Sequence, residues 1–448
     1  MSGKLAIQCP QNKLFDAAVQ VIKTIRERGF DIYIVGGAVR DLVLNRLPDD
    51  IDMVTTAHPE DIKNIFPDAE MVGACFGVVL VKYNGSVFEL ATCREERLYS
   101  DGRRPDEVRF TTDFRQDVLR RDFTVNAMLY DPLSGEVIDY VGGLPDLRNR
   151  VIRAIGNAAG RFSEDYLRML RAVRFAARLD FQIHPEAWQA ICNMANKTAL
   201  IAAERVRCEL ESMLTGSDPA RAMELLKASR ILKLWLPEVD ALAGVAQHPV
   251  YHPEGDVWQH TMLMLKNAAK PCSVEFAWSI LLHDIGKKPT FELDKDNIPH
   301  FYGHEACGAE MIGAIAQRLR FSRELTDTVE HAVRWHMRFA SVMEMREAKL
   351  KRLMAEKYFA MELELHKLDC QCSNGLTATC EFLRQKLKKM ENCKLPPPLL
   401  NGRDLIKMGL VPGREFKEIL NAVMDAQLEK RLNSKNGAVE WVKKNFLR

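Results

Sequence analysis

The chain has 448 residues, about three times the size of a typical domain, so we expect two to four domains. Hydrophobic residues make up 47% of it and charged residues 28%, and 63 Lys and Arg face 61 Asp and Glu. This composition excludes a disordered chain, which has fewer core-forming residues or a larger net charge. The longest apolar runs, such as residues 32–39, are far shorter than the roughly twenty residues of a membrane span.

The first residues and the cysteines indicate the compartment. The opening MSGKLAIQCPQNK has no basic stretch followed by an apolar one, so we expect no export signal. The 11 cysteines show no repeating spacing and no C-x-x-C pair, which favours reduced, mostly buried thiols over a disulfide framework. We therefore predict a cytoplasmic protein that does not contact membranes.

Taken in chain order, the first third has the pattern of a mixed α/β domain. A helix is expected over residues 14–28, ending at Gly29, and Asn84-Gly85 is a hairpin signal between two strand-like runs. The expected strands cover 31–35, 78–83, 87–91 and 137–140. From Glu164 onward the periodicity is helical. Turn signals divide the chain into four expected segments: 1–155, 156–218, 219–380 and 381–448.

Two glycines and two aspartates in the first segment form the most specific pattern. Gly36-Gly37 directly follows a strand, where the backbone can approach a ligand and offer N–H groups to phosphate oxygens. Asp50 and Asp52 are expected at alternate positions of a strand, so that both point to one face. Two carboxylates there can hold Mg²⁺, which prefers oxygen ligands. Glu89, on another predicted strand, can supply a third carboxylate.

Further along, two motifs combine arginines with carboxylates. In RRDFTVN, residues 120–126, Arg121 can contact a triphosphate, and Asp122 and Asn126 are expected to share a helix face and hold a ribose. In EDYLR, residues 164–168, Asp165 and Arg168 are three apart on an expected helix and can reach one ligand together. Arg171 and Arg174 continue that helix.

These motifs resemble a known family. GGAVRD and DDIDMVT, together with RRDFTVNAM, EDYLRMLRAVRFAARL and ERVRCELESML, are similar to the class II nucleotidyltransferases, which include CCA-adding tRNA nucleotidyltransferases and bacterial poly(A) polymerases. The resemblance implies an α+β head, a polymerase-β-like nucleotidyltransferase with a small mixed sheet and helices, on a mostly helical body. It implies that Asp50 and Asp52 bind catalytic Mg²⁺, that Glu89 assists, and that Arg40 belongs to the nucleotide site.

The resemblance also implies the reaction and its nucleotides. The RNA 3′-hydroxyl attacks the α-phosphate of CTP or ATP, and pyrophosphate leaves. Arg168 can donate to cytosine N3 or adenine N1, and Asp165 can accept from N4 or N6. Guanine and uracil reverse both groups and leave buried polar atoms unpaired, at a cost of roughly 1–3 kcal/mol each. The expected substrates are therefore CTP, ATP and a tRNA 3′ end.

Alternatives within the family remain open. Its poly(A) polymerases carry a Gly, two basic residues and Phe where this chain has Gly73-Ala74-Cys75-Phe76. Residues 94–104 instead resemble the flexible loop of CCA-adding enzymes, so CCA addition is favoured over poly(A) addition. An enzyme that adds only A is not excluded by this loop. An inactive RNA-binding protein is the alternative from another class.

The second half is rich in histidine, and 9 of the 11 His lie between His248 and His366. An apolar helix is expected to end at His283-Asp284, and Gly286 can terminate it. With His260 before and Asp369 after, this series resembles an HD-type phosphohydrolase domain. The resemblance implies a site for Ni, Mn, Zn or Mg. Its expected ligands are His260, His283, Asp284 and Asp369, with His304 and His331 as candidates for a second metal or a phosphate.

Taken together, the sequence predicts a nucleotidyltransferase head (1–155), a helical neck for base recognition and RNA binding (156–218), an HD-type metal-binding domain (219–380) and a helical RNA-binding tail (381–448). Basic stretches agree with an RNA partner: residues 148–178 hold eight Arg against two acids, and residues 428–448 hold six Lys and Arg against two Glu. The oligomeric state is not predicted.

Overall fold

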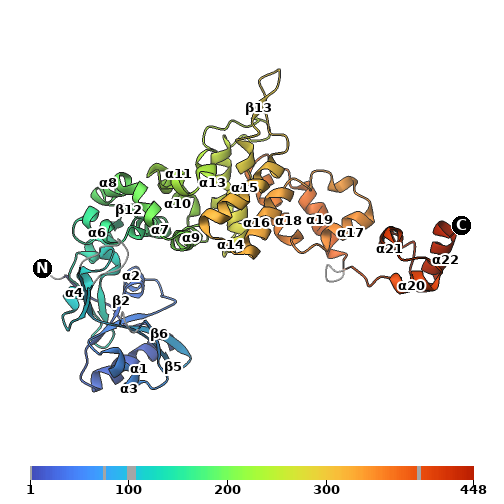
Figure 1. Cartoon of the computed structure of the whole chain (residues 1–448). Helices are drawn as coiled ribbons and strands as arrows, with labels where there is room; N and C mark the ends of the chain where they lie inside the picture. Colours follow the sequence, from blue (N-terminus) through green and yellow to red (C-terminus); the bar gives the residue numbers. More distant parts are fainter. Residues whose placement is uncertain (1–2, 74–76, 98–106, 391–394, 448) are drawn as a thin grey trace. The chain divides into compact units, whose positions relative to one another are not determined.

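A computed structural model describes residues 3–73, 77–97, 107–390 and 395–447 of the chain (Figure 1). The chain forms two compact units, Met1–Trp235 and Leu236–Arg448, which are treated separately below. This division falls inside the third of the four segments expected from the sequence, whose boundaries stay a prediction. Within the described ranges, no helix combines the length and the apolar character that crossing a membrane requires.

The first unit contains a mixed sheet with strand order β1-β10-β9-β2-β3-β6-β5-β4. Its strands are β1 (Gly3–Ala6), β2 (Ile32–Val35), β3 (Asp52–Thr55), β4 (Glu70–Gly73), β5 (Val78–Tyr83), β6 (Ser86–Thr92), β9 (Leu129–Asp131) and β10 (Glu136–Asp139). Strands β3 and β6 pair in parallel, and the other pairs are antiparallel. The predicted α+β head is confirmed.

Local sequence explains how the sheet is connected. Asn12 caps α1 (Lys13–Glu27) by accepting from Phe15 N–H, and the buried face of this helix agrees with the predicted helix. Asn84 and Gly85 both have positive φ, which joins β5 to β6 by the predicted tight turn. Between β2 and β3 lies α2 (Gly37–Val43), and α3 (Pro59–Ile65) follows β3.

Beside the sheet, β7 (Arg94–Arg97) pairs with β8 (Glu107–Phe110). The flexible loop was predicted over residues 94–104, and most of it falls within 98–106, outside the described residues. The rest of the first unit is mainly helical. Its elements are α4 (Phe114–Leu119), η2 (Thr124–Asn126), α5 (Gly143–Arg148), β11 (Val151–Ile152), α6 (Ala158–Glu164), α7 (Leu167–Leu179), β12 (Gln182–Ile183), α8 (Pro185–Met194), η3 (Ala195–Leu200), α9 (Ala203–Leu214), α10 (Pro219–Ala228) and α11 (Ile231–Trp235).

The second unit is helical apart from the short hairpin of β13 (Glu292–Leu293) and β14 (Pro299–His300). Its helices are α12 (Pro237–Asp240), α13 (Val257–Asn267), α14 (Val274–Leu282), η4 (Ile285–Lys287), α15 (His304–Leu319), α16 (Arg323–Trp335), η5 (Val342–Glu344), α17 (Glu347–Met354), α18 (Phe359–Cys372), α19 (Ala378–Lys388), α20 (Gly402–Lys407), α21 (Arg414–Leu428) and α22 (Lys435–Phe446). The predicted helical body is confirmed.

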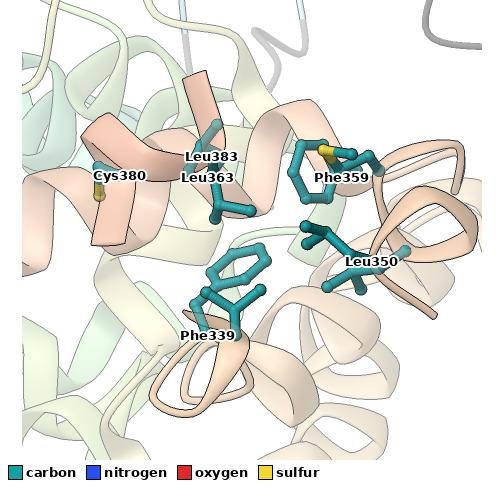
Figure 2. Packing of buried hydrophobic residues seen from close by; sticks show 9 residues of the cluster. Phe339, Leu350, Phe359, Leu363, Cys380 and Leu383 are labelled. Carbon is teal, nitrogen blue, oxygen red and sulfur yellow. The ribbon is translucent and has the colours of Figure 1, made fainter. Parts of the chain in front are cut away.

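An apolar cluster fixes the helix that carries Asp369. Phe359 and Leu363 of α18 pack with Phe339, Leu350 and Leu383 from the neighbouring elements, and Figure 2 shows these side chains converging. Phe339 and Leu383 are fully buried. Because this packing anchors one end of α18, the position of Asp369 further along the same helix is set by a hydrophobic core.

Gly286 allows η4 to lie against α15. A Cβ atom added at residue 286 would be 2.0 Å from the carbonyl oxygen of His304 and 2.6 Å from the nitrogen of Gly308. Both contacts involve backbone, which cannot move aside as a flexible side chain can. The missing side chain therefore brings the His283-Asp284 turn next to the first residue of α15.

We expect the Gly286→Ala substitution to destabilise the second unit by about 1–3 kcal/mol, because the added methyl group must push η4 away from α15. Gly313→Ala is the matched control on α15: a Cβ there meets nothing within 4 Å, and alanine is the better helix former. Thermal unfolding followed by circular dichroism measures both. Equal melting temperatures for Gly286→Ala and the unsubstituted protein would contradict this packing.

Candidate functional site

A pocket of about 850 Å³ opens in the first unit, within the size range of ligand sites. All of the nucleotide-binding residues predicted from the sequence line it: Gly36, Gly37, Arg40, Arg121, Asp122, Asn126, Asp165, Arg168, Arg171 and Arg174. Asp50 and Asp52 line it too, whereas Glu89 is not among the lining residues. Residues more than a hundred positions apart in the sequence thus meet around one cavity rich in arginine.

The three predicted catalytic carboxylates lie on or beside the paired strands β3 and β6. Asp52 begins β3 and stands in register with Glu89 of β6, so the two side chains leave the sheet on one face. Asp50 lies in the loop before β3, two residues ahead of the first residue of the strand. The prediction that it occupies the strand is therefore wrong. All three side chains are exposed, as metal-binding groups at a pocket mouth must be.

Desolvation and repulsion between carboxylates together change the protonation of Asp52. Partial desolvation, followed by the negative charges of Glu89 and Asp50, raises the pKa of Asp52 to about 6, and Arg121 offsets only part of this. A divalent cation removes such repulsion by binding between the oxygens. The donor set, all carboxylate oxygen, fits Mg²⁺.

The glycine turn approaches the same carboxylate. Gly36 has a φ of +78°, and a Cβ there would stand 3.7 Å from Asp52 Oδ2. Arg40, by contrast, is buried and already paired: its guanidinium donates to Asp41 at 2.9 Å and to Asn126 Oδ1 at 2.8 Å. Arg40 therefore acts first as a clamp that holds Asn126. The buried Nδ2 of Asn126 has no hydrogen-bond partner among the described residues, which leaves a donor for a ligand.

Asp122 and Asn126 do not share an α-helix, so that expectation is wrong. Asp122 lies in a turn, and Asn126 ends the single 3-10 turn η2. Both residues still line the one pocket, where Arg171 Nη2 is 2.7 Å from Asp122 Oδ2. Arg121 is 3.0 Å from the buried Asp117 and keeps a position at the pocket edge.

Asp165 and Arg168, the residues expected to recognise the base and called the reader below, are arranged differently from the prediction. Asp165 has extended backbone and separates α6 from α7, while Arg168 lies in the first turn of α7, so the two do not share one continuous helix. Arg168 pairs with Glu164 rather than with Asp165. Asp165 instead receives two hydrogen bonds from Arg205 of α9, at 2.8 and 3.3 Å. Both reader side chains still line the one pocket.

Two partners of the reader were missed by sequence reasoning. The i,i+4 spacing of Glu164 and Arg168 was a local signal for their ion pair. No local signal links Arg205 to Asp165, because forty residues separate them. On the next turns of α7, Arg174 pairs with Glu209 at 2.7 Å, and Arg171 reaches the same carboxylate at 4.0 Å.

In the second unit, histidines and carboxylates from several helices form a buried cluster. His260 of α13, His283 and Asp284 offer ligand atoms within 4.8 Å of one another, as do Asp284, His304 and His336. His260 Nε2 is also 3.2 Å from Asp369 Oδ1. Five of the six metal-site residues predicted from the sequence are thus brought together: His260, His283, Asp284, Asp369 and His304.

Backbone hydrogen bonds fix the orientation of three of these imidazoles. Nδ1 of His283, His304 and His336 lies 2.9, 2.9 and 2.7 Å from the carbonyl oxygens of residues 280, 301 and 333. An Nδ1–H that donates to a carbonyl leaves Nε2 as a lone pair, the arrangement of a metal-binding histidine. His304 Nε2 and His336 Nε2 then face each other at 3.1 Å. Two facing lone pairs repel, and a cation between them removes the repulsion.

The protonation of His336 and of Asp284 agrees with a metal site. Burial, together with the charge of His283, lowers the pKa of His336 to about 3, so its imidazole is neutral near pH 7. Burial acts to raise the pKa of Asp284, but His283 and Lys287 hold it well below its usual range. Neutral imidazole beside an ionised carboxylate is the donor set of a divalent transition metal or Mg²⁺.

His331 is the exception among the predicted metal residues, and its assignment is corrected. Its Nε2 lies 2.7 Å from Glu362 Oε1, and its ring packs on Tyr358 at 4.5 Å. It joins none of the three candidate metal groups found among the described residues. His336, one turn further on, takes the expected place because the last turn of α16 points toward Asp284.

Sequence reasoning also missed the carboxylate of Glu254, which lies next to the cluster. Glu254 Oε1 lies 2.9 Å from His252 Nδ1 and 2.6 Å from His260 Nδ1. The carboxylate thus orients the His260 ring so that Nε2 faces Asp369, the role that a second layer of residues has in metal sites. Glu254 and His260 are only six residues apart in the sequence. Because Glu254 lies in the loop before α13, helix periodicity does not predict their contact.

Comparisons with known protein families match three parts of the chain. Family models match residues 32–153 as a poly A polymerase head domain, 180–242 as a probable RNA and SrmB-binding site of polymerase A, and 257–367 as an HD domain. The chain therefore contains a poly A polymerase head domain and an HD domain.

The chain is similar to CCA-adding enzymes. The one from Lactococcus lactis subsp. lactis is 44% identical over 228 residues, which cover 50% of this chain and 57% of that protein. The one from Lactobacillus johnsonii is 38% identical over 262 residues, or 57% of this chain and 65% of that protein. The matched part thus spans less than two thirds of the length of these relatives.

Solved structures show the same likeness over a longer stretch. The crystal structure of the Bacillus stearothermophilus CCA-adding enzyme in complex with CTP has a TM-score of 0.71 and 27% identity, covering 97% of this chain and 99% of that one. The Thermotoga maritima CCA-adding enzyme complexed with tRNA has a TM-score of 0.61 and 21% identity, with 98% of each chain covered. The second likeness concerns the fold alone.

The placement of His336 and His331 gives a direct test of the metal cluster. We expect His336→Ala to weaken the binding of Mn²⁺ to the metal-free protein at least tenfold, because it removes a neutral imidazole that faces Asp284. His331→Ala is the matched control from the same helix and should bind Mn²⁺ as the unsubstituted protein does. Isothermal titration calorimetry measures both affinities. A larger loss in His331→Ala than in His336→Ala would overturn this assignment.

Proposed function

We propose that this protein adds CCA to the 3′ end of tRNA, using CTP and ATP and no nucleic-acid template. The observation that carries the proposal is the single pocket shared by the carboxylates Asp50 and Asp52 and by the pair Asp165 and Arg168. A nucleoside triphosphate needs a cation site at its phosphates and a hydrogen-bonding site at its base, and this pocket offers both. The similarity to CCA-adding enzymes supports the same reaction.

In the proposed reaction the RNA 3′-hydroxyl attacks the α-phosphorus, and pyrophosphate leaves. Asp50, Asp52 and Glu89 would hold Mg²⁺, which when bound neutralises the phosphates and stabilises the attacking and leaving oxygens. Arg121 at the pocket edge is placed to donate to the triphosphate. The unpartnered Nδ2 of Asn126 and the carboxylate of Asp122 line the same pocket and would hold the ribose.

Base selection in this proposal rests on a fixed acceptor and a fixed donor. Arg205 holds Asp165 through both carboxylate oxygens, and Glu164 holds Arg168. Since these partners restrain both side chains, the reader presents one hydrogen-bonding pattern, which cytosine and adenine match and guanine and uracil do not. The choice of CTP and ATP then follows from the protein itself.

Incubation with tRNA that lacks its last three nucleotides, with labelled CTP and ATP, tests this proposal. We expect three added nucleotides followed by a stop, counted on a sequencing gel. Asp50→Ala should abolish incorporation, since it removes a ligand of the catalytic cation, while tRNA binding remains measurable. A long A tail would favour poly(A) polymerase, addition of A alone an A-adding enzyme, and no addition an inactive RNA-binding protein.

A second activity is proposed for the HD domain, because its buried ligand cluster is complete. His260, His283, Asp284 and Asp369 would hold one divalent metal, and His304 and His336 a second metal or a phosphate. A metal held by these residues would lower the pKa of water and so favour hydrolysis of a phosphate ester. Removing a phosphate or a 2′,3′-cyclic phosphate would give the free 3′-hydroxyl that the transferase head requires.

The basic tail would contribute to binding of the same RNA, and we retain the cytoplasm as the expected compartment.

Hydrolysis of 2′,3′-cyclic AMP in the presence of Mn²⁺, Ni²⁺ or Mg²⁺ tests the HD activity. We expect the double variant His283→Ala/Asp284→Ala to lose at least 100-fold in kcat/KM, because both residues are ligands at the centre of the cluster. CCA addition by this variant serves as the control for folding of the head. Hydrolysis at the rate of the unsubstituted protein would show that the site is assigned wrongly.

A further inference from the structure

Two exposed tyrosines lie on loops beside the HD cluster. The side chain of Tyr302, just before α15, is 81% exposed, and that of Tyr251, in the loop before α13, is 57% exposed. Each ring rests on an imidazole: Tyr302 on His300 at 4.6 Å and Tyr251 on His248 at 4.8 Å between centroids. A histidine backing restrains each tyrosine ring while one face stays open to solvent.

Both loops lead directly into the metal cluster. Phe301, next to Tyr302, accepts the hydrogen bond from Nδ1 of His304 at 2.9 Å. His252, next to Tyr251, packs its ring against that of His260 at 5.1 Å. Each exposed tyrosine is thus one or two residues away from a group that touches a candidate metal ligand.

Lys287 links the two loops at the cluster. Its Nζ donates to Gln247 Oε1 at 2.7 Å, lies 2.7 Å from Asp284 Oδ2 and stands over the Phe301 ring at 5.4 Å. The ammonium group therefore faces the loop of Tyr251, the loop of Tyr302 and the candidate metal site together. A phosphate at the metal site would meet this cation, and the nucleotides attached to it would extend toward the loops.

We infer that Tyr302 and Tyr251 form a stacking subsite for the terminal bases of a single-stranded RNA 3′ end whose phosphate enters the HD site. This inference rests on the phosphohydrolase function proposed above and adds the class of substrate. Stacking on an aromatic ring accepts every base, because each base has a π face.

The test compares two substrates for the full-length protein with Mn²⁺. An RNA oligonucleotide with a 3′-phosphate can reach the tyrosines, whereas p-nitrophenyl phosphate cannot. We expect Tyr302→Ala to raise KM for the oligonucleotide about 5- to 150-fold, the range of one lost base stack, and to leave hydrolysis of p-nitrophenyl phosphate unchanged. Tyr302→Phe retains the ring and should behave as the unsubstituted protein does.

Leu293→Ala is the matched control, since this aliphatic side chain is 51% exposed on the same hairpin and offers no ring. Equal KM values for the oligonucleotide in Tyr302→Ala and Leu293→Ala would overturn the inference and leave the proposed phosphohydrolase intact. So would dissociation of a dimer by Tyr302→Ala, seen in sedimentation, without an effect on RNA.

A binding measurement separates this inference from the proposed function. Metal-free protein is titrated into the same oligonucleotide carrying 2-aminopurine as its last base, whose fluorescence is quenched by stacking. If the unsubstituted protein hydrolyses neither substrate but Tyr302→Ala still removes the quenching, the phosphohydrolase proposal fails while the stacking subsite stands. Unchanged quenching in Tyr302→Ala overturns the subsite.

Discussion

The parallel pairing of β3 with β6 is the constraint on which the head depends. This pairing sets Asp52 opposite Glu89. Asp50 lies two residues before Asp52, in the loop that leads into β3. Partial desolvation, followed by the negative charges of Glu89 and Asp50, raises the pKa of Asp52. A cation bound beside these carboxylates would relieve their repulsion.

The second unit shows the same principle with different donors. His304 and His336 are turned toward each other by backbone carbonyls that bind their Nδ1 atoms. Their Nε2 atoms lie 3.1 Å apart, and a cation bound to both would relieve repulsion between their lone pairs. In both units, therefore, the protein scaffold holds together groups whose repulsion a bound metal would relieve.

In the first unit, ion pairs organise the helices α7 and α9 beside the pocket. Arginines of α7 and α9 pair with acids that are distant in the sequence, such as Arg205 with Asp165 and Arg171 with Asp122. Each pair neutralises a charge in the pocket wall and also restrains a group that faces the ligand. An array of this kind can present fixed hydrogen-bonding groups to a base, which flexible, unpaired arginines cannot do.

The sequence by itself determined the α+β head, the helical body, the hairpin at Asn84-Gly85 and nearly all residues of both sites, because turn chemistry, periodicity and short motifs are local. Tertiary structure alone decided how those residues meet. The break at Asp165, the partner Arg205 and the choice of His336 over His331 depend on helix packing between segments far apart in the chain. A spacing of three or four residues places side chains on one helix face only where the helix is continuous, and that continuity is set by the neighbours against which it packs.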